Sequence, residues 1–372
     1  MPGDGQAAGA RQSIQPPCCW TTASRVGSAA PSSNSTAPST WAWAPDRSQR
    51  LRRGFQLAFL LLNLWIGARF YLFVRYYETA GKSVWAARPP GVQGWLPIAS
   101  LMNLKLLLAT GEVPRLHPAG LFLLLAFLGM SWLARKSFCG WLCPVGTISE
   151  YLWRLGRRTF GRNFHLPRRL DIGLRSLKYL LLGLFLYAVC SMPVPAIRAF
   201  LEGPYGVVDD VKMLNFFRLL GIGGGAVVAL LVVASVFVEN FWCRYLCPYG
   251  ALMGLAALAS PLRIRRDTSL CIDCDKCTKA CPSALPVAKL IAIRSAECTG
   301  CLQCVAACPA AGALAMVAPG RRPVPAWAMA AVVAGLFLGI CGYARWSGHW
   351  HTDLPSRLYF ELIPKANEFT HP

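Results

Sequence analysis

The sequence predicts an all-α membrane protein of about five transmembrane helices, with a small cysteine-rich α+β module inserted before the last helix. Of its 372 residues, 55% are hydrophobic and only 15% are charged, which is too apolar for an ordinary soluble enzyme. Five apolar stretches are long enough to cross a bilayer, because a hydrocarbon core of ~30 Å needs ~20 residues of helix. These stretches occupy residues 55–77, 116–135, 177–195, 219–239 and 325–344.

The basic residues beside these stretches predict their orientation. Lys and Arg cluster before the first stretch, between the second and third, and after the fourth, whereas the loop 196–218 balances its charges. Cytoplasmic loops carry the excess of Lys and Arg, so the N-terminus and the inserted module are predicted to be cytoplasmic and the C-terminus periplasmic. The same rule accounts for the net charge of +21, and we therefore expect the lipid bilayer, and no nucleic acid, as a partner.

The chain divides into five predicted segments. They are a disordered tail (1–50), a four-helix transmembrane part (51–260), the cysteine-rich module (261–320), a fifth transmembrane helix (321–346) and a periplasmic tail (347–372). The first is rich in Ser, Ala, Pro and Gly, and we give its Cys18 and Cys19 no role. No small-residue cleavage site accompanies the first apolar stretch, which predicts an uncleaved membrane helix. The apolar segment 95–109 is shorter and is predicted to be interfacial or re-entrant.

Eight cysteines have a spacing that binds iron–sulfur clusters. Residues 271–282 read CIDCDKCTKACP and residues 298–309 read CTGCLQCVAACP, each with the C-x2-C-x2-C-x3-C-P spacing of bacterial two-cluster ferredoxins. In that fold the fourth cysteine ligates the other cluster. We therefore assign one [4Fe–4S] cluster to Cys271, Cys274, Cys277 and Cys308, and a second to Cys298, Cys301, Cys304 and Cys281. A zinc site is the alternative, but the doubled spacing is much more specific than a lone C-x2-C.

Four more cysteines lie in an internal duplication of the membrane part. FCGWLCPVG at 138–146 and WCRYLCPYG at 242–250 each follow an apolar stretch at its cytoplasmic end. Cysteines four apart share a helical face, and Pro suits the first turn of a new helix. We predict redox-active thiols, or ligands of an additional cluster or metal, at Cys139, Cys143, Cys243 and Cys247. The alternative is a set of small buried residues at two helix junctions, which is the role we expect of Cys190 and Cys341.

The doubled C-x3-C-P motif and the two-cluster module together resemble the polyferredoxin-type membrane electron-transfer proteins, of the NapH, NosR and CcoG type. The resemblance covers about residues 50–320. It implies a multi-pass protein of the bacterial inner membrane that moves electrons between quinol or quinone, cytoplasmic [4Fe–4S] clusters and a redox partner protein. It also implies a redox or metal-binding role for the C-x3-C-P cysteines. The chain departs from these proteins in having a fifth span after the module, and about 28 residues after that span are too few for the β-sandwich tail of the oxidase assembly members.

Quinol oxidation requires a proton acceptor near the membrane surface, for which His is suited by its pKa of ~6.5. We predict that His117 accepts this proton in a quinol site with Trp95, Glu112 and Arg69; a capping or turn role for His117 is the alternative. No two of the five histidines occupy a helix interior as haem ligation requires, so no haem is expected. The chain has no P-loop and no G-x-G-x-x-G after a strand, so no nucleotide is expected.

Two other functions stay open at this stage. The first is a copper reductase that assembles a respiratory oxidase, because Cys and Met are soft ligands for Cu(I) and Met130 and Met253 lie near the C-x3-C-P motifs. The second is a redox-sensing regulator whose clusters catalyse nothing. If the chain is an enzyme, quinol-linked electron transfer makes it an oxidoreductase. The direction of electron flow is not encoded in the cysteine spacing, because iron–sulfur potentials span a wide range.

Overall fold

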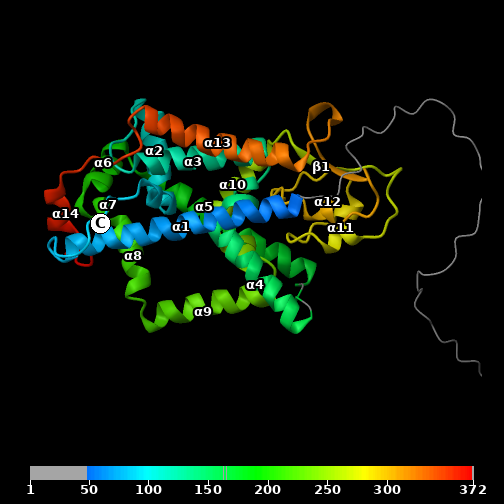
Figure 1. The fold of residues 1–372 in the computed structure, drawn as a ribbon, viewed down its shortest axis with the longest axis horizontal. Helices are drawn as coiled ribbons and strands as arrows, with labels where there is room; N and C mark the ends of the chain where they lie inside the picture. The colour runs from blue at the N-terminus through cyan, green and yellow to red at the C-terminus, as the bar shows by residue number, and fades with distance from the viewer. Residues whose placement is uncertain (1–47, 162, 165, 371–372) are drawn as a thin grey trace, which may run out of the picture. The chain divides into compact units, whose positions relative to one another are not determined.

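The computed structural model describes residues 48–161, 163–164 and 166–370 (Figure 1). The predicted tail, with Cys18 and Cys19, lies outside the described residues except for its last three positions, which begin the first helix. The described residues form part of one compact unit. Most of them are helical.

Eight helices make up the apolar part of the chain. They are α1 (Ser48–Glu78), α2 (Pro97–Thr110), α3 (Pro118–Leu133), α4 (Pro144–Phe160), α5 (Arg168–Ser191), α9 (Ile222–Phe237), α10 (Pro248–Leu258) and α13 (Ala326–Trp346). Proline occupies the first position of α2, α3, α4 and α10, where its missing N–H is not needed and its φ angle suits the helix. The segment predicted as interfacial or re-entrant is therefore helical, and it packs against α3 and α5.

Short helices fill the loops. They are α6 (Val194–Glu202), α7 (Pro204–Val207), α8 (Asp209–Arg218), α11 (Lys276–Lys279), α12 (Gln303–Ala306) and α14 (Ser356–Leu362). The charge-balanced loop predicted at 196–218 is thus largely helical, because α6, α7 and α8 follow one another through it.

Three described helices, α1, α5 and α13, are long and apolar enough to cross a membrane. A fourth span results if α8 and α9 are counted together, although the pair bends by 83° at its break. The second predicted span is the 16-residue helix α3, which is shorter than the ~20 residues that a straight crossing needs. It is buried along most of its length, because α2, α10 and α13 pack around it (Figure 1). The chain is therefore an integral membrane protein with three or four candidate spans, and the count of five stays a prediction.

The cysteine-rich module lies between α10 and α13. Its sheet has two antiparallel strands, β1 (Arg263–Arg266) and β2 (Leu314–Val317), with Ile264 opposite Met316. Both of these side chains are buried, and their neighbours along each strand are more exposed, as expected for a sheet with one covered face. With α11 and α12, which pack against each other, the module combines short helices with a small sheet.

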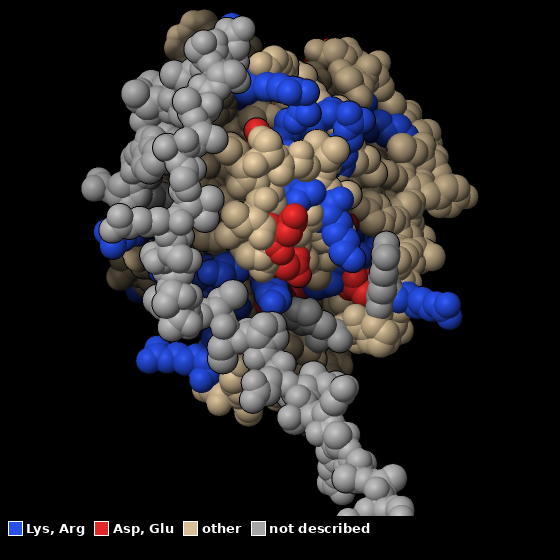
Figure 2. Space-filling view, turned by 90° about the vertical axis from the view of Figure 1, so that its right-hand side faces the viewer, with Lys and Arg blue, Asp and Glu red and all other residues tan. Residues whose placement is uncertain are grey.

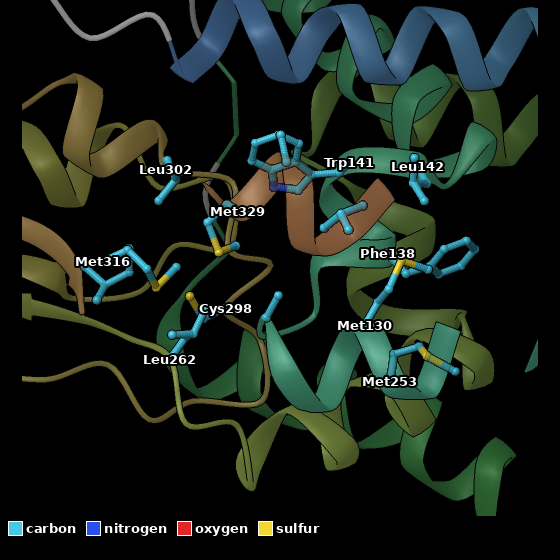
Figure 3. Packing of buried hydrophobic residues seen from close by; sticks show 14 of the residues in the cluster. Met130, Phe138, Trp141, Leu142, Met253, Leu262, Cys298, Leu302, Met316 and Met329 are labelled. Atoms are coloured by element: carbon cyan, nitrogen blue, oxygen red, sulfur yellow. The ribbon is translucent and has the colours of Figure 1, made fainter. Parts of the chain in front are cut away.

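One hydrophobic core joins the module to the helices. Figure 3 shows Met130 of α3, Met253 of α10 and Met329 of α13 in the same cluster as Cys298 and Met316 of the module. Close packing of this kind makes the two parts one folding unit rather than two domains on a linker. The core therefore continues across the position near residue 260 where the sequence changes character.

Candidate iron–sulfur and thiol site

Each C-x3-C-P motif forms a five-residue π turn followed directly by a helix. The turns are η3 (Phe138–Leu142) and η4 (Trp242–Leu246). The N–H of Cys143 donates to the carbonyl of Phe138 at 2.9 Å, and the N–H of Cys247 donates to the carbonyl of Trp242 at 3.0 Å. The sequence duplication is thus a duplication of backbone geometry, in a type of turn that is frequent at functional sites.

The second cysteine of each motif caps the helix that follows it. The N–H of Gly146 donates to Sγ of Cys143 at 3.5 Å, and the N–H of Gly250 donates to Sγ of Cys247 at 3.2 Å. A sulfur at a helix N-terminus faces free N–H groups and the positive end of the helix dipole, which favours its anionic form. Gly146 has no room for a side chain, because a Cβ there would stand 2.7 Å from the carbonyl of Cys139.

The four thiols of the two motifs are free and near enough to influence one another's pKa, although within the described residues no three of them stand close enough to share one metal ion. Burial, together with the nearby Cys139 and Cys247, raises the pKa of the Cys143 thiol to about 12. Burial also raises the pKa of Cys139, to about 11, against the opposing effect of the Lys136 ammonium group. The pKa of Cys243 rises because of burial and because of the other three thiols. The fold therefore brings the two halves of the duplication to one place.

All four thiols line a single large cavity. Its volume is about 1090 Å³, and Cys301 of the predicted second cluster lines it too. Along α1 the lining extends from Arg52 to Arg69, which at 1.5 Å per residue is about 25 Å of helix. Most of the wall is apolar, and α1, α2, α3, α5 and α13 contribute to it together with the segment 87–95 and the two thiol turns. The cavity thus extends along much of α1 and reaches the four thiols.

Buried charges surround the thiol end of this cavity. Burial would lower the pKa of Lys136, but the neighbouring Cys139, Glu297, Cys247 and Cys243 hold it above its usual value. Burial likewise opposes ionisation of Glu297, whose pKa is nevertheless lowered by Lys136 and Lys178. Nζ of Lys178 lies 2.7 and 2.6 Å from the two Glu297 oxygens.

These two lysines and Glu297 carry a net positive charge at neutral pH. Lys136 lies near the thiols of Cys139, Cys243 and Cys247 and near Glu297, which directly precedes Cys298 in the chain. A positive neighbour stabilises negative charge on sulfur, whether the sulfur is a free thiolate or a cluster ligand.

A second set of buried polar residues lies at the thiol end of the large cavity. Arg52 binds Glu150 through two hydrogen bonds, Nη1–Oε2 at 2.8 Å and Nη2–Oε1 at 2.5 Å, and its Nη1 also donates to the carbonyl of Gly140 at 3.0 Å. Gln303 of α12 donates to the same carboxylate at 2.9 Å. Burial would raise the pKa of Glu150, but the Arg52 hydrogen bonds and charge hold it below its usual value. α1, α4 and the module are therefore tied to one buried carboxylate.

The thiol turns contact the cluster loop of the module directly. The indole N–H of Trp141 donates to the carbonyl of Gly300 at 3.1 Å. A Cβ on Gly140 would stand 2.6 Å from the carbonyl of Thr299, and a Cβ on Gly254 would stand 2.9 Å from the carbonyl of Ala296. Each repeat therefore uses a glycine to approach the segment around Cys298.

Six of the eight predicted cluster ligands have other predicted ligands as close neighbours. Burial raises the pKa of Cys281 to about 12, and Cys301 and Cys298 lie near enough to add to that rise. Cys304 has Cys301, Cys298 and Cys281 as neighbours, whereas Cys277 has Cys308 as a neighbour. Cys281 thus lies near the 298–304 run and Cys308 near Cys277, which supports the predicted exchange of the fourth cysteine, while the full ligand assignment stays a prediction.

The donor set of the module fits iron–sulfur chemistry, since all eight thiols are free and lie in tight loops. Asp273, Asp275 and Leu302 adopt positive φ angles that wrap the chain around each group. Within the described residues, no three His, Cys, Asp or Glu side chains come close enough to share one metal ion. The ligands of a cube stand around four iron atoms and do not converge on a single point.

The four members of the predicted quinol site are not brought together. Trp95 and Arg69 line the large cavity, and Trp95 donates its indole N–H to Asn63 at 3.1 Å. His117 is 1% exposed, is not among the lining residues, and has its Nε2 2.8 Å from the carbonyl of Gly206. Glu112 is exposed and pairs with Arg198 at 3.3 Å. The proton-accepting role of His117 stays a prediction, and its burial outside the cavity gives it no direct path to a ligand there.

The other cysteine, histidine and methionine candidates also divide into residues that line the large cavity and residues that do not. Cys341 and His351 line the cavity, whereas Cys190 is exposed elsewhere on α5. Met130 and Met253 are fully buried in the hydrophobic core and are not among the lining residues.

Sequence reasoning missed the buried charges. Arg52 and Lys136 were counted only as signals of orientation, and Glu150 and Glu297 were not singled out. Two features of the sequence could have identified these carboxylates. Glu150 is an isolated negative residue within a strongly basic segment, and Glu297 immediately precedes a predicted cluster cysteine.

A helical membrane protein with two runs of iron–sulfur ligand spacing and a cavity lined by four further thiols belongs to the class of iron–sulfur electron-transfer proteins. The chain matches a 4Fe-4S binding domain at residues 116–163 and again at 220–266, so each match contains one C-x3-C-P turn. A 4Fe-4S dicluster domain matches residues 263–309.

Similarity extends over most of the chain to YccM of Escherichia coli (strain K12), which is 49% identical over 326 residues, covering 86% of this chain and 91% of that protein. The chain therefore belongs to the family of YccM, and the resemblance to polyferredoxin-type membrane electron-transfer proteins is confirmed. The regulatory protein NosR of Pseudomonas aeruginosa is 34% identical over 165 residues, covering 43% of this chain and 22% of NosR. The ferredoxin-type protein NapH of E. coli is 28% identical over 151 residues, covering 40% of this chain and 48% of NapH. No solved structure matches the chain.

Proposed function

We propose that this protein transfers electrons between the quinone pool of the membrane and two [4Fe–4S] clusters, through the four C-x3-C-P thiols, and on to or from a redox partner protein. The observation that carries the proposal is the large cavity, because Cys139, Cys143, Cys243, Cys247 and Cys301 all line it. A molecule bound in this cavity contacts apolar helix surfaces at one end. At the other end it contacts the C-x3-C-P thiols and Cys301, a predicted cluster ligand.

The chain's own residues suit each part of this task. The apolar wall accommodates an isoprenoid tail, since ligand cavities of this kind are mostly apolar with a few placed polar groups. Lys136 and the Lys178–Glu297 pair supply positive charge at the thiol end, which stabilises the two thiolates that form when a disulfide between two of these cysteines takes up two electrons; the thiolate pair returns to the disulfide when it passes one electron to each cluster. The clusters, when bound, supply one-electron carriers next to Cys301.

The proposed arrangement in the membrane follows the charge distribution. The N-terminus and the cluster module face the cytoplasm, where thiols stay reduced, and the tail after α13 faces the periplasm. In the five-span arrangement α3 and the α8–α9 pair cross together with α1, α5 and α13. Cysteine labelling from each side of spheroplasts, with single exposed cysteines in the tail and in the module, tests this sidedness.

Reduction of the purified protein by a quinol analogue tests the proposed electron transfer. Anaerobic protein in detergent is mixed with a menaquinol or ubiquinol analogue, and cluster reduction is followed by absorbance and electron paramagnetic resonance. The quinol loses two electrons and two protons, and each cluster takes up one electron. We expect Cys243→Ser to slow this transfer at least tenfold, with Cys190→Ser as the matched control at wild-type rate.

A cavity-filling variant separates quinol access from thiol chemistry. Leu101→Trp, in the apolar wall, should raise the quinol concentration needed without altering cluster reduction by dithionite. Quinol-dependent reduction that is unchanged in both Cys243→Ser and Leu101→Trp would contradict the proposal. No specific observation favours copper reduction or redox sensing, since the methionines that suggested copper lie in the core rather than in the cavity wall.

A further inference from the structure

A second cavity, of about 560 Å³, lies between α4, the start of α1 and the two short helices of the module. Its lining is strongly basic and contains one carboxylate, Glu239. The basic lining residues are Arg53, Arg154, Arg157, Arg158 and Lys279. Figure 2 shows the end of the molecule that carries the module, where Lys and Arg side chains visibly outnumber Asp and Glu.

Several polar groups of this cavity have no partner within the described part of the chain. Arg53, Arg158 and Lys279 form no ion pair there, whereas Arg154 is paired with Glu150. The guanidinium of Arg157 lies over the ring of Trp153, 4.9 Å from its centroid. Trp153 is 3% exposed, and its indole N–H is buried without a hydrogen-bond partner.

An unpaired buried N–H is costly, and a buried polar group of this kind calls for a ligand or a water to accept its hydrogen. The rule that places basic residues on the cytoplasmic side explains why these charges exist. That rule does not explain why these basic residues surround a cavity whose wall contains the buried, unpaired indole N–H of Trp153.

The outer face of α4 indicates where this cavity lies relative to lipid. Ile148, Tyr151 and Leu155 are each about half exposed, at 49%, 47% and 55%. Their spacing of three and four places them on one face of the helix. A helix with an apolar stripe beside a basic face lies in the membrane interface with its charges at the level of the headgroups. The basic cavity therefore stands next to that level.

We propose that this basic cavity binds a phosphate group of an anionic ligand, and that the apolar stripe of α4 selects the headgroup of an anionic phospholipid. Arginine forks and an indole N–H are donors that match phosphate oxygens. Ala280 and Ala307, which line the cavity, directly precede Cys281 and Cys308, so a bound headgroup braces the cluster module against the membrane helices. This site is separate from the large cavity and independent of the direction of electron flow.

Lipid binding to the full chain with its clusters intact tests this proposal. The protein is purified in a non-ionic detergent and titrated with phosphatidylglycerol or with phosphatidylcholine, and bound lipids are counted by native mass spectrometry. Inorganic pyrophosphate, measured by isothermal titration calorimetry, is the soluble phosphate probe. Arg53→Gln and Arg157→Gln remove lining charges, and Arg50→Gln removes an exposed charge from the same end of α1 that does not line the cavity.

We expect phosphatidylglycerol to bind in preference to phosphatidylcholine and about fivefold more weakly to each lining variant, which is the effect of one basic charge near an anionic surface. Arg50→Gln should bind as the wild type does. Pyrophosphate binding with the same dependence on Arg53 and Arg157, without a preference for phosphatidylglycerol, supports the phosphate site and assigns it a soluble ligand. Equal affinity of all three variants for both probes, with wild-type iron content, overturns the proposal.

Discussion

The indole N–H of Trp141 and the carbonyl of Gly300, 159 residues apart, are joined by a hydrogen bond of 3.1 Å. Trp141 belongs to the first C-x3-C-P turn, and Gly300 lies between two cluster cysteines. Trp141 is fully buried, so no water is available to replace either partner. The bond therefore fixes the thiol turn and the cluster loop relative to each other, which is a requirement for electron transfer between them.

Trp141→Phe should weaken this connection. The change keeps an aromatic ring in the core but leaves the Gly300 carbonyl unsatisfied, which costs about 1–3 kcal/mol. We expect a lower thermal unfolding midpoint and partial loss of iron from the purified protein. Trp132→Phe is the matched control, because Trp132 is 53% exposed and should behave as the wild type. Equal unfolding midpoints for the two variants would show that the bond contributes nothing.

Gly140→Ala tests the close approach of the same turn to the module. The added Cβ would stand 2.6 Å from a backbone oxygen of Thr299, which cannot move like the end of a flexible side chain. Overpacking of this kind costs about 1–3 kcal/mol, so the module should separate and release iron more readily. Gly129→Ala in α3 has open space around it and is the control. Iron contents that match between these two alanine variants would contradict the proposed contact.

Arg52→Gln should destabilise the protein much more than loss of an exposed arginine does. Removing Arg52 takes hydrogen bonds from the buried Glu150 carboxylate, which Arg154 still partly neutralises, and loss of hydrogen bonds to a charged group costs about 1.5–3 kcal/mol. Arg75→Gln removes an arginine from the same helix whose side chain is 45% exposed, and should cost less than about 1 kcal/mol. Thermal unfolding of both variants measures the difference. Similar midpoints would mean that Arg52 acts only as an orientation signal.

The lowered pKa of Glu150 predicts a loss of stability in acid. Because the native pKa lies below the ordinary value of 4.5, the unfolded chain takes up the proton more readily than the native protein. The contribution of Glu150 is therefore complete above pH 4.5 and is lost as the pH falls below that value through the native pKa.

Unfolding midpoints at pH 6 and pH 4 measure this effect. Glu150→Gln should lower the midpoint at pH 6 and reduce the further fall at pH 4. Glu112→Gln, at an exposed carboxylate, shares any general effect of acid on the clusters and should retain the full fall. An unchanged pH dependence in Glu150→Gln would contradict the assignment.

Cys281→Ser should damage the cluster formed by the other run of cysteines. Burial and the nearby Cys301 and Cys298 raise the pKa of its thiol, although Cys277 is closer to it in sequence. We expect its electron paramagnetic resonance spectrum to match that of Cys301→Ser and to differ from that of Cys274→Ser. A match to Cys274→Ser instead would mean that each run holds its own cluster.

Residue spacing predicted the chemistry because ligand patterns are local. The doubled C-x2-C-x2-C-x3-C-P runs and the repeated C-x3-C-P motif can each be recognised within twelve residues, and the dicluster and 4Fe-4S domain matches agree with them. The helices could also be predicted from the sequence, because apolar runs and prolines such as Pro118 and Pro144 mark where helices begin. The number of spans was less accessible, because hydropathy alone does not separate a buried core helix such as α3 from a crossing one.

Sequence patterns could not predict that the two C-x3-C-P motifs share one cavity. Cys139 and Cys243 are about a hundred residues apart, and their common cavity exists only because α3, α5 and α10 pack together. Arg52 and Lys136 have the sequence signature of solvated cytoplasmic charges, yet both are buried beside carboxylates from distant segments. The linear chain thus specifies which groups can bind iron or exchange electrons. Burial and long-range packing, which depend on every helix at once, specify which of them share a site.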